Sequence, residues 1–232
     1  MTSKDKTAWK PDPLPRGRHK LSPEVVKASQ KDRLVRAMLE VVNEEGYEGT
    51  TVPKVVARAR VSTNAFYSFF DDKAACFIEI CEQAGNELFD SFAENATAPD
   101  WVTAFERGIG MYLRWWQESA AMTKAYMIDF PAVGRRSADE RDRQHERFKT
   151  IMRYSANWAR QEDPSLAPIS EIALDAAVSA PTDLVGREVR AGRLDRLTDL
   201  EDDILYLLIK LLSDDATAQR AAESREERRA EG

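Results

Sequence analysis

The sequence predicts an all-α protein of 232 residues, and three features support this fold class. Glycine and proline number only 10 each, so few residues interrupt regular structure. Apolar residues recur at intervals of three and four through most of the chain, as they do along one face of a helix. The strict alternation that is typical of strands is nowhere sustained. With 43% hydrophobic residues, the chain can bury one or two ordinary cores.

Charge is distributed unevenly along this chain. Residues 1–73 hold 14 of the 34 Lys and Arg and 10 of the 40 Asp and Glu, so a front of +4 precedes a body of -10. The basic front predicts a polyanionic partner for that part only. No apolar run approaches the roughly 20 residues that a membrane span needs, and no apolar segment follows the basic N-terminus as in a secretory signal. We therefore expect a cytoplasmic protein with no membrane partner.

The front begins with a predicted arm and one long helix. Residues 1–21 are rich in proline and lack a helical period, which predicts an extended arm. Ser22 followed by Pro23 predicts a helix start, because serine caps free N–H groups and proline is tolerated in the first turn. The helix is expected over 23–45, with Gly46 as its stop.

Two short helices are expected next. Thr51 is predicted to cap a helix that ends near Ala59, and Ser62 is predicted to cap a second helix that runs through Phe70. A short turn that contains Val61 joins them. This arrangement predicts a helix-turn-helix, whose second helix can enter the major groove of DNA.

These residues resemble the N-terminal domain of the TetR family of transcriptional regulators, whose signature is T-V-x-x-I-A-x-x-A-G-V-S-x-x-x-F-Y-x-x-F-x-x-K. The chain departs from it at Val56, Arg60 and Phe69. Arg60 replaces a turn glycine, so it must either adopt a left-handed conformation or alter the turn. The matching residues are Thr51, Val52, Val55, Ala59, Val61, Ser62, Phe66, Tyr67, Phe70, Asp72 and Lys73.

The predicted DNA contacts divide into base reading and phosphate binding. The first turn of the recognition helix can meet base edges, where Asn64 can bond adenine and the methyl groups of Thr63 and Ala65 can contact thymine. The resemblance implies that Tyr67 and Lys73 bind phosphates, together with the helix N-termini at Thr51 and Ser62. The alternative for the polar residues is a solvated helix start.

The arm adds two further candidates for DNA contact. Arg16 and Arg18 flank a glycine, and this triplet resembles the core of the hooks that enter A·T-rich minor grooves. A solubilising tail is the equally weighted alternative.

The body over 74–213 is expected to contain further helices, at about 101–116, 120–130, 137–161, 168–191 and 199–213. The resemblance implies an effector cavity in the middle of this domain, and the aromatic and methionine residues there predict a small, mostly apolar or aromatic ligand. A cationic aromatic ligand is a second possibility. For each such residue, ordinary core packing is the alternative. The predicted lining is Phe105, Met111, Tyr112, Trp115, Trp116, Tyr126, Met127, Phe130, Phe148 and Met152.

The resemblance also implies a homodimer through the last two helices of the body. Their apolar residues agree with this, although a bundle core uses the same pattern. Pro181 is expected to kink or interrupt the first of the two helices. A charged tail, frayed or weakly helical, is expected over 214–232. The predicted interface residues are Ile172, Val178, Val185, Val189, Ile204, Leu207, Leu208, Leu211 and Leu212.

The sequence argues against an enzyme. His19 and His145 are its two histidines, and no metal, nucleotide or nucleophile motif is present, so we expect no catalytic residue, metal or cofactor. Cys76 and Cys81 lie among apolar residues, where thiols are inert. The prediction is a repressor that an effector releases from a near-palindromic operator. The alternative is a helical ligand-binding or thiol-sensing protein without sequence-specific DNA binding.

Overall fold

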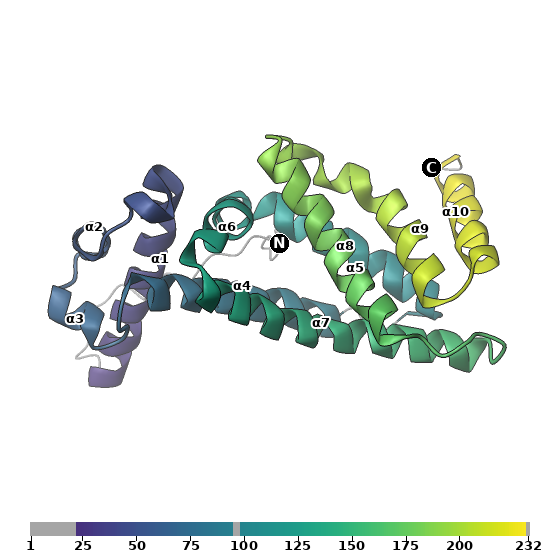
Figure 1. Ribbon diagram of the computed structural model, residues 1–232, viewed down its shortest axis with the longest axis horizontal. Coiled ribbons are helices and arrows are strands. Elements are labelled where there is room, and N and C mark those ends of the chain that lie inside the picture. The colour runs from purple at the N-terminus through teal and green to yellow at the C-terminus, as the bar shows by residue number, and fades with distance from the viewer. Residues whose placement is uncertain (1–21, 95–97, 231–232) are drawn as a thin grey trace, which may run out of the picture. The chain divides into compact units, whose positions relative to one another are not determined.

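The computed structural model describes residues 22–94 and 98–230, and all regular structure in these ranges is helical (Figure 1). The predicted all-α class is confirmed, while the predicted arm with Arg16 and Arg18 lies outside the described residues. The elements are α1 (Pro23–Gly49), α2 (Val52–Ala59), α3 (Thr63–Tyr67), α4 (Lys73–Glu94), α5 (Trp101–Glu118), α6 (Ala120–Lys124), η1 (Ala125–Asp129), η2 (Phe130–Val133), α7 (Arg135–Glu162), α8 (Glu171–Arg190), η3 (Leu194–Leu200), α9 (Glu201–Leu212) and α10 (Asp215–Ala230).

The chain forms two compact units. The first unit contains the chain up to Asn86 together with Ser119–Glu140, and the second contains Glu87–Glu118 together with the chain from Arg141 onward. The predicted functional divisions at residues 73 and 213 do not coincide with these limits, because α4 and α7 each contribute residues to both units.

In the first unit, α1 begins at the expected residue and is interrupted at Gly46, the expected stop, although it extends to Gly49. The Ser22 hydroxyl accepts a hydrogen bond from the Val25 N–H at 3.4 Å, and Gly46 leaves the helical conformation with a φ of 72°. A last short turn follows Gly46, and the Asp129 carboxylate accepts a bond from the Tyr47 N–H at 3.0 Å. The segment that contains Asp129 therefore fixes the end of α1.

The two short helices of the helix-turn-helix form with two differences from the prediction. Thr51 precedes α2, but its side chain makes no capping bond; Pro53 lacks one of the N–H groups that such a cap accepts. The recognition helix α3 ends at Tyr67 rather than near Phe70. Tight bonds from the Ser68 N–H to Ala65 O, at 3.2 Å, and from the Phe69 N–H to Phe66 O, at 2.9 Å, close its last turn.

Arg60 takes the first of its two predicted conformations. It joins α2 to α3 with φ 53° and ψ 49°, which is left-handed backbone that disfavours a residue with a Cβ. We expect Arg60→Gly to raise the free energy of unfolding by about 1 kcal/mol in a urea titration followed by circular dichroism. Arg58→Gly, inside α2, is the matched control and should lower it. An unchanged stability for Arg60→Gly would mean that the turn holds no strain.

The second unit is a bundle in which α5 packs against η3 and α9, and α9 also contacts α8 and α10. Helix α8 continues through Pro181 without interruption, and the Thr182 hydroxyl donates to Val178 O at 3.1 Å. The charged tail, expected to be frayed or weakly helical, forms a helix, α10, that lies along α9. In the first unit, the helix expected over 120–130 is divided into α6, the π-helix η1 and the 3₁₀ helix η2.

Candidate functional site

The recognition helix is anchored by one face and exposed on the other. The Ser62 hydroxyl accepts a bond from the Ala65 N–H at 3.1 Å, which confirms the predicted cap. Phe66 is fully buried, whereas Thr63, Asn64 and Tyr67 are exposed, with Tyr67 at 56%. The helix therefore presents its predicted base-reading side chains to solvent. Ala65 is half-buried beside them.

Lys73 has partners that the sequence did not predict. Its ammonium donates to Tyr47 O at 2.9 Å and to Thr50 O at 3.0 Å, and it lies 4.2 Å from the centre of the Tyr47 ring. These carbonyls lie at the end of α1, where Tyr47 O also accepts a bond from the Thr50 N–H at 3.2 Å. In the structure Lys73 links the start of α4 to the end of α1, and its phosphate-binding role stays a prediction.

Several other cations of the first unit are paired with carboxylates. Arg58 bonds Glu44 at 2.5 Å, and Arg136 bonds Asp72 at 2.7 Å. Lys27 differs, because its ammonium lies 5.7 Å from the centre of the Phe69 ring, directly after the recognition helix. Lys27 is exposed on α1 and is a candidate phosphate ligand that sequence reasoning missed.

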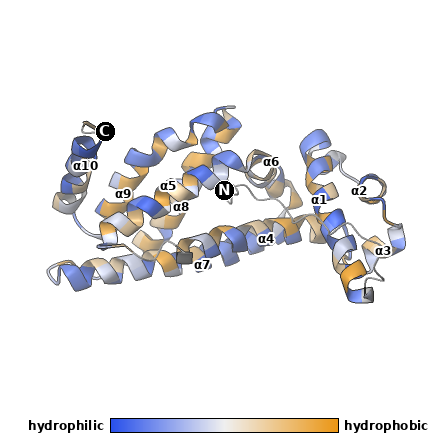
Figure 2. Ribbon diagram, turned by 180° about the vertical axis from the view of Figure 1, so that it is seen from behind, coloured by the Kyte–Doolittle hydropathy of each residue, from blue (hydrophilic) through white to orange (hydrophobic). Residues whose placement is uncertain are grey.

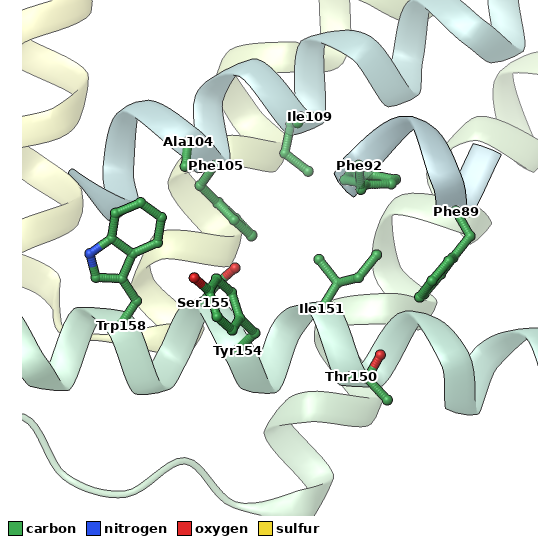
Figure 3. Close-up of a pocket in the computed structure, with 11 residues that line it drawn as sticks. Phe89, Phe92, Ala104, Phe105, Ile109, Thr150, Ile151, Tyr154, Ser155 and Trp158 are labelled. Atoms are coloured by element: carbon green, nitrogen blue, oxygen red, sulfur yellow. The ribbon is translucent and has the colours of Figure 1, made fainter. Parts of the chain in front are cut away.

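The second unit contains a cavity of about 260 Å³ between α4, α5 and α7. In Figure 3, Phe105 and Ile109 project from α5 toward α7, while Phe89 and Phe92 close one end. The lining is apolar apart from hydroxyl groups, and it carries no charged side chain. The lining residues are Phe89, Phe92, Ala104, Phe105, Gly108, Ile109, Thr150, Ile151, Tyr154, Ser155 and Trp158.

Of the predicted ligand contacts, only Phe105 lines this cavity. Phe148 is outside the lining but contacts two lining residues: its ring lies 5.8 Å from that of Phe89 and 5.9 Å from that of Phe92. Met152 is buried on α7 outside the lining. The other predicted contacts on α5 are Met111, Tyr112, Trp115 and Trp116, and those in the first unit are Tyr126, Met127 and Phe130.

These residues are core residues for identifiable reasons. Tyr112 turns toward α8, where its hydroxyl lies 3.2 Å from the Thr182 hydroxyl, and the rings of Trp115 and Trp116 are 4.8 Å apart. Phe130 is fully buried in the first unit, with its ring 5.6 Å from that of Phe77. A helix with two apolar faces can turn only one of them toward a given cavity.

A spacing signal for the cavity was present in the sequence. On α5 the lining falls at 104, 105, 108 and 109, and on α7 at 150, 151, 154, 155 and 158, which are stripes of helical period. The α7 stripe mixes hydroxyl and aromatic groups. Such a stripe is atypical of a dry core and typical of a wall that a ligand contacts.

A charged cluster holds α7 against α8 near this wall. The buried Lys149 ammonium bonds Asp175 at 2.7 Å and Glu171 at 3.3 Å. The bond to Asp175 raises the pKa of Lys149, and the same bond lowers the pKa of Asp175. The charged run that contains His145 therefore supports the bundle. Within 22–94 and 98–230, no cluster of His, Cys, Asp or Glu is arranged to hold a metal ion.

Both cysteines are buried and reduced. Burial raises the pKa of the Cys76 thiol and of the Cys81 thiol well above the ordinary range, so neither has thiolate character at neutral pH. This disfavours the thiol-sensing alternative.

The predicted interface residues on α8 and α9 separate into two groups. Most of their side chains lie in the core of the single chain: Val178, Val185, Val189, Ile204, Leu208 and Leu212. Ile172 is 80% exposed, and Leu207 and Leu211 are half-buried. Any partner surface on these helices therefore uses the second group.

Comparison with known proteins identifies the first unit. Residues 34–80 match the family described as "Bacterial regulatory proteins, tetR family", and these residues contain most of α1, the helix-turn-helix and the start of α4. The chain thus carries the N-terminal domain of the TetR family of transcriptional regulators, and the recognition made from the sequence is confirmed. A search of curated proteins finds no match.

Solved structures share the fold over most of the chain. The fatty acid degradation regulator FadR of Bacillus halodurans has a TM-score of 0.69 at 15% identity, covering 82% of this chain and 97% of that one. FadR of Bacillus subtilis, solved in complex with stearoyl-CoA, has a TM-score of 0.68 at 15% identity, covering 76% and 96%. A TetR family regulator of Marinobacter aquaeolei VT8 has a TM-score of 0.61 at 15% identity, covering 82% and 99%.

These relatives and the matching family are transcriptional regulators and not enzymes, as the sequence predicted. In the part of the chain that the structure describes, no helix is both long and apolar enough to cross a membrane.

Proposed function

We propose that this protein is a dimeric repressor that binds a near-palindromic DNA operator and is released from it by a small, uncharged apolar or aromatic effector. The observation that carries the proposal is the capped recognition helix, with Thr63 and Asn64 exposed and Phe66 anchored. Exposed polar side chains on the first turn of such a helix suit base readout in the major groove.

The cavity supports the effector class. Five aromatic rings and two isoleucines make up most of its lining, and hydroxyl groups supply the polar contacts. A ligand there gains affinity from buried apolar area, and a charged group within the lining would lose its hydration without a partner. This favours a neutral ligand over the cationic one. The stearoyl-CoA of the Bacillus subtilis FadR complex is a precedent for an apolar chain in this fold.

Helix α4 offers a route from effector to DNA. It begins at Lys73, which bonds the end of α1, and it carries Phe89 and Phe92 of the cavity lining. A ligand that binds more tightly to one position of Phe89 and Phe92 would favour one arrangement of the two helix-turn-helix domains of the dimer.

A homodimer through α8 and α9 would bury apolar surface that one chain leaves exposed. Ile172 is 80% exposed, and half-buried leucines on the two helices accompany it: Leu184, Leu207 and Leu211. A twofold interface of this kind would match the twofold symmetry of a palindromic operator.

The function is tested by selecting bound duplexes from random DNA with the full-length protein and then adding neutral apolar compounds. We expect a near-palindromic site, a dimer in analytical ultracentrifugation, and a log–log salt slope of roughly -0.9 per phosphate contact. Release of the DNA by such a compound supports the repressor. A protein that binds the compounds but no duplex at any salt concentration would instead be a ligand carrier.

Two variants of the recognition helix distinguish base reading from phosphate binding. Asn64→Ala is expected to lower affinity about tenfold (~1.4 kcal/mol) for the preferred base at one step per half-site, with little loss where that base is already wrong. Tyr67→Phe, which removes one hydroxyl from the same exposed face, should weaken all sequences alike. Binding to a panel of single-base operator variants measures both. Uniform losses from both variants would contradict base reading by Asn64.

A further inference from the structure

The C-terminal helix α10 has little apolar surface with which to pack. It spans 16 residues, and Figure 2 shows it as a largely hydrophilic helix beside α9. Alanines supply its apolar contact: Ala221 is buried, and it lies with Ala222 against Leu205 and Ile209 of α9. A helix of this length is marginal alone, so its stability depends on what fixes it to the bundle.

Three arginines fix α10 at the place where α5 and α9 meet. Arg225, whose side chain is 13% exposed, bonds Glu201 at 2.9 Å and Asp202 at 2.8 Å. Arg229 also bonds Asp202. Arg228 is the one of the three that reaches α5, where a single guanidinium nitrogen bonds both carboxylate oxygens of Glu106 at 2.9 Å.

Glu106 lies on a turn of α5 that contributes to the cavity wall, although its own side chain is outside the lining. Glu106 follows Ala104 and Phe105, which both line the cavity, on the same turn of α5. Its side chain is 15% exposed, whereas that of Arg228 is 57% exposed. An ion pair with one exposed partner is weak and screened by salt, so this link between α10 and α5 can open while Arg225 stays bound to α9.

We infer that α10 is a strap that positions the effector cavity, with Arg228 and Glu106 as the positioning residues. The inference rests on the proposed ligand site. Docking of α10 holds the turn of α5 that presents Phe105, and ligand in the cavity favours the docked strap by the same coupling free energy. A neutral aromatic ligand is the probe for this coupling between α10 and the cavity.

The test uses N-phenyl-1-naphthylamine, an uncharged dye that fluoresces in apolar surroundings, with the full-length protein. Arg228→Gln is expected to raise its dissociation constant about threefold. The matched control is Arg220→Gln on the same helix: Arg220 donates to Thr217 of α10, and its charge acts on Asp163 and Asp214, so its partners lie outside α5. This variant should leave the constant unchanged. Because the dye has no charge, raising salt should weaken its binding to the parent more than to Arg228→Gln.

Two further measurements separate positioning from general destabilisation. Glu106→Gln should match Arg228→Gln, and the double variant should cost no more than either single one. Saturating dye should slow amide hydrogen exchange across 215–230 in the parent but not in Arg228→Gln. The proposed role of α10 would be overturned by equal dye affinities for Arg228→Gln and Arg220→Gln, or by amide exchange in α10 that does not change when dye is added. Either result would leave the proposed ligand site intact. A parent that binds no dye would overturn the ligand site as well.

Discussion

Replacing Ala104 by tryptophan is expected to lower the affinity for N-phenyl-1-naphthylamine by at least about 100-fold, or ~2.7 kcal/mol, and to leave DNA affinity within about twofold. Ala104 lines the cavity from α5, opposite the stripe on α7. An indole ring there would occupy much of a space of about 260 Å³ and exclude a ligand of that size. If the proposed repressor function holds, no effector of this class would release the variant from DNA.

Fluorescence titration measures the dye affinity, and a gel-shift assay measures the DNA affinity and its response to dye. The control is Asn157→Trp, which adds the same ring at an exposed position of α7 outside the lining. It should bind dye and DNA as the parent does. Unchanged dye binding by Ala104→Trp would place the effector elsewhere.

The helix-turn-helix could be predicted from sequence because its signals are local. A cap such as Ser62 acts on N–H groups two or three residues away, and Gly46 ends a helix through its own φ. The left-handed Arg60 was one of two stated possibilities for the same reason. Signals of this range do not depend on which distant segment packs against them.

The cavity could not be assigned to residues from sequence because α5 is apolar on more than one face. Phe105 and Trp115 are equally plausible contacts until the packing of α5 against α7 and α9 is known. An aromatic residue is more often core than cavity wall, and here most of the predicted contacts are core. On α5, only the tertiary structure distinguishes core residues from cavity wall, whereas the mixed hydroxyl and aromatic stripe on α7 gave a signal in the sequence.

The docking of the charged C-terminus on the bundle could not be predicted for a related reason. Its composition resembles that of a solvated tail, and its stabilising partners, Glu106, Glu201 and Asp202, lie far away in the sequence. Pairing between distant charges leaves no periodic signature. The contacts of Lys73 could not be predicted for the same reason, since both of its carbonyl partners lie at the end of α1.

The largest stability effect in the first unit is expected from Lys73→Met. Methionine keeps the apolar stem but leaves Tyr47 O and Thr50 O without their charged donor, which should cost about 2–3 kcal/mol in the free energy of unfolding. Hydrogen exchange of the slowest amides in α1 reports this loss for the first unit. The tryptophans of the described chain belong to the second unit and should report no change.

Lys27→Met is the control with the opposite expected outcome. Lys27 is exposed, lies next to Phe69, which follows the recognition helix, and caps no helix end within the described residues. It should leave amide exchange unchanged and reduce the log–log salt slope of DNA binding by roughly 0.9 per subunit. Lys73→Met should do the reverse: at temperatures where the first unit stays folded, its salt slope should equal that of the parent. A reduced slope with normal amide exchange for Lys73→Met would support the phosphate-binding role that the family pattern implies. The two variants would thus distinguish a lysine that stabilises the first unit, Lys73, from a lysine whose charge DNA phosphates neutralise, Lys27.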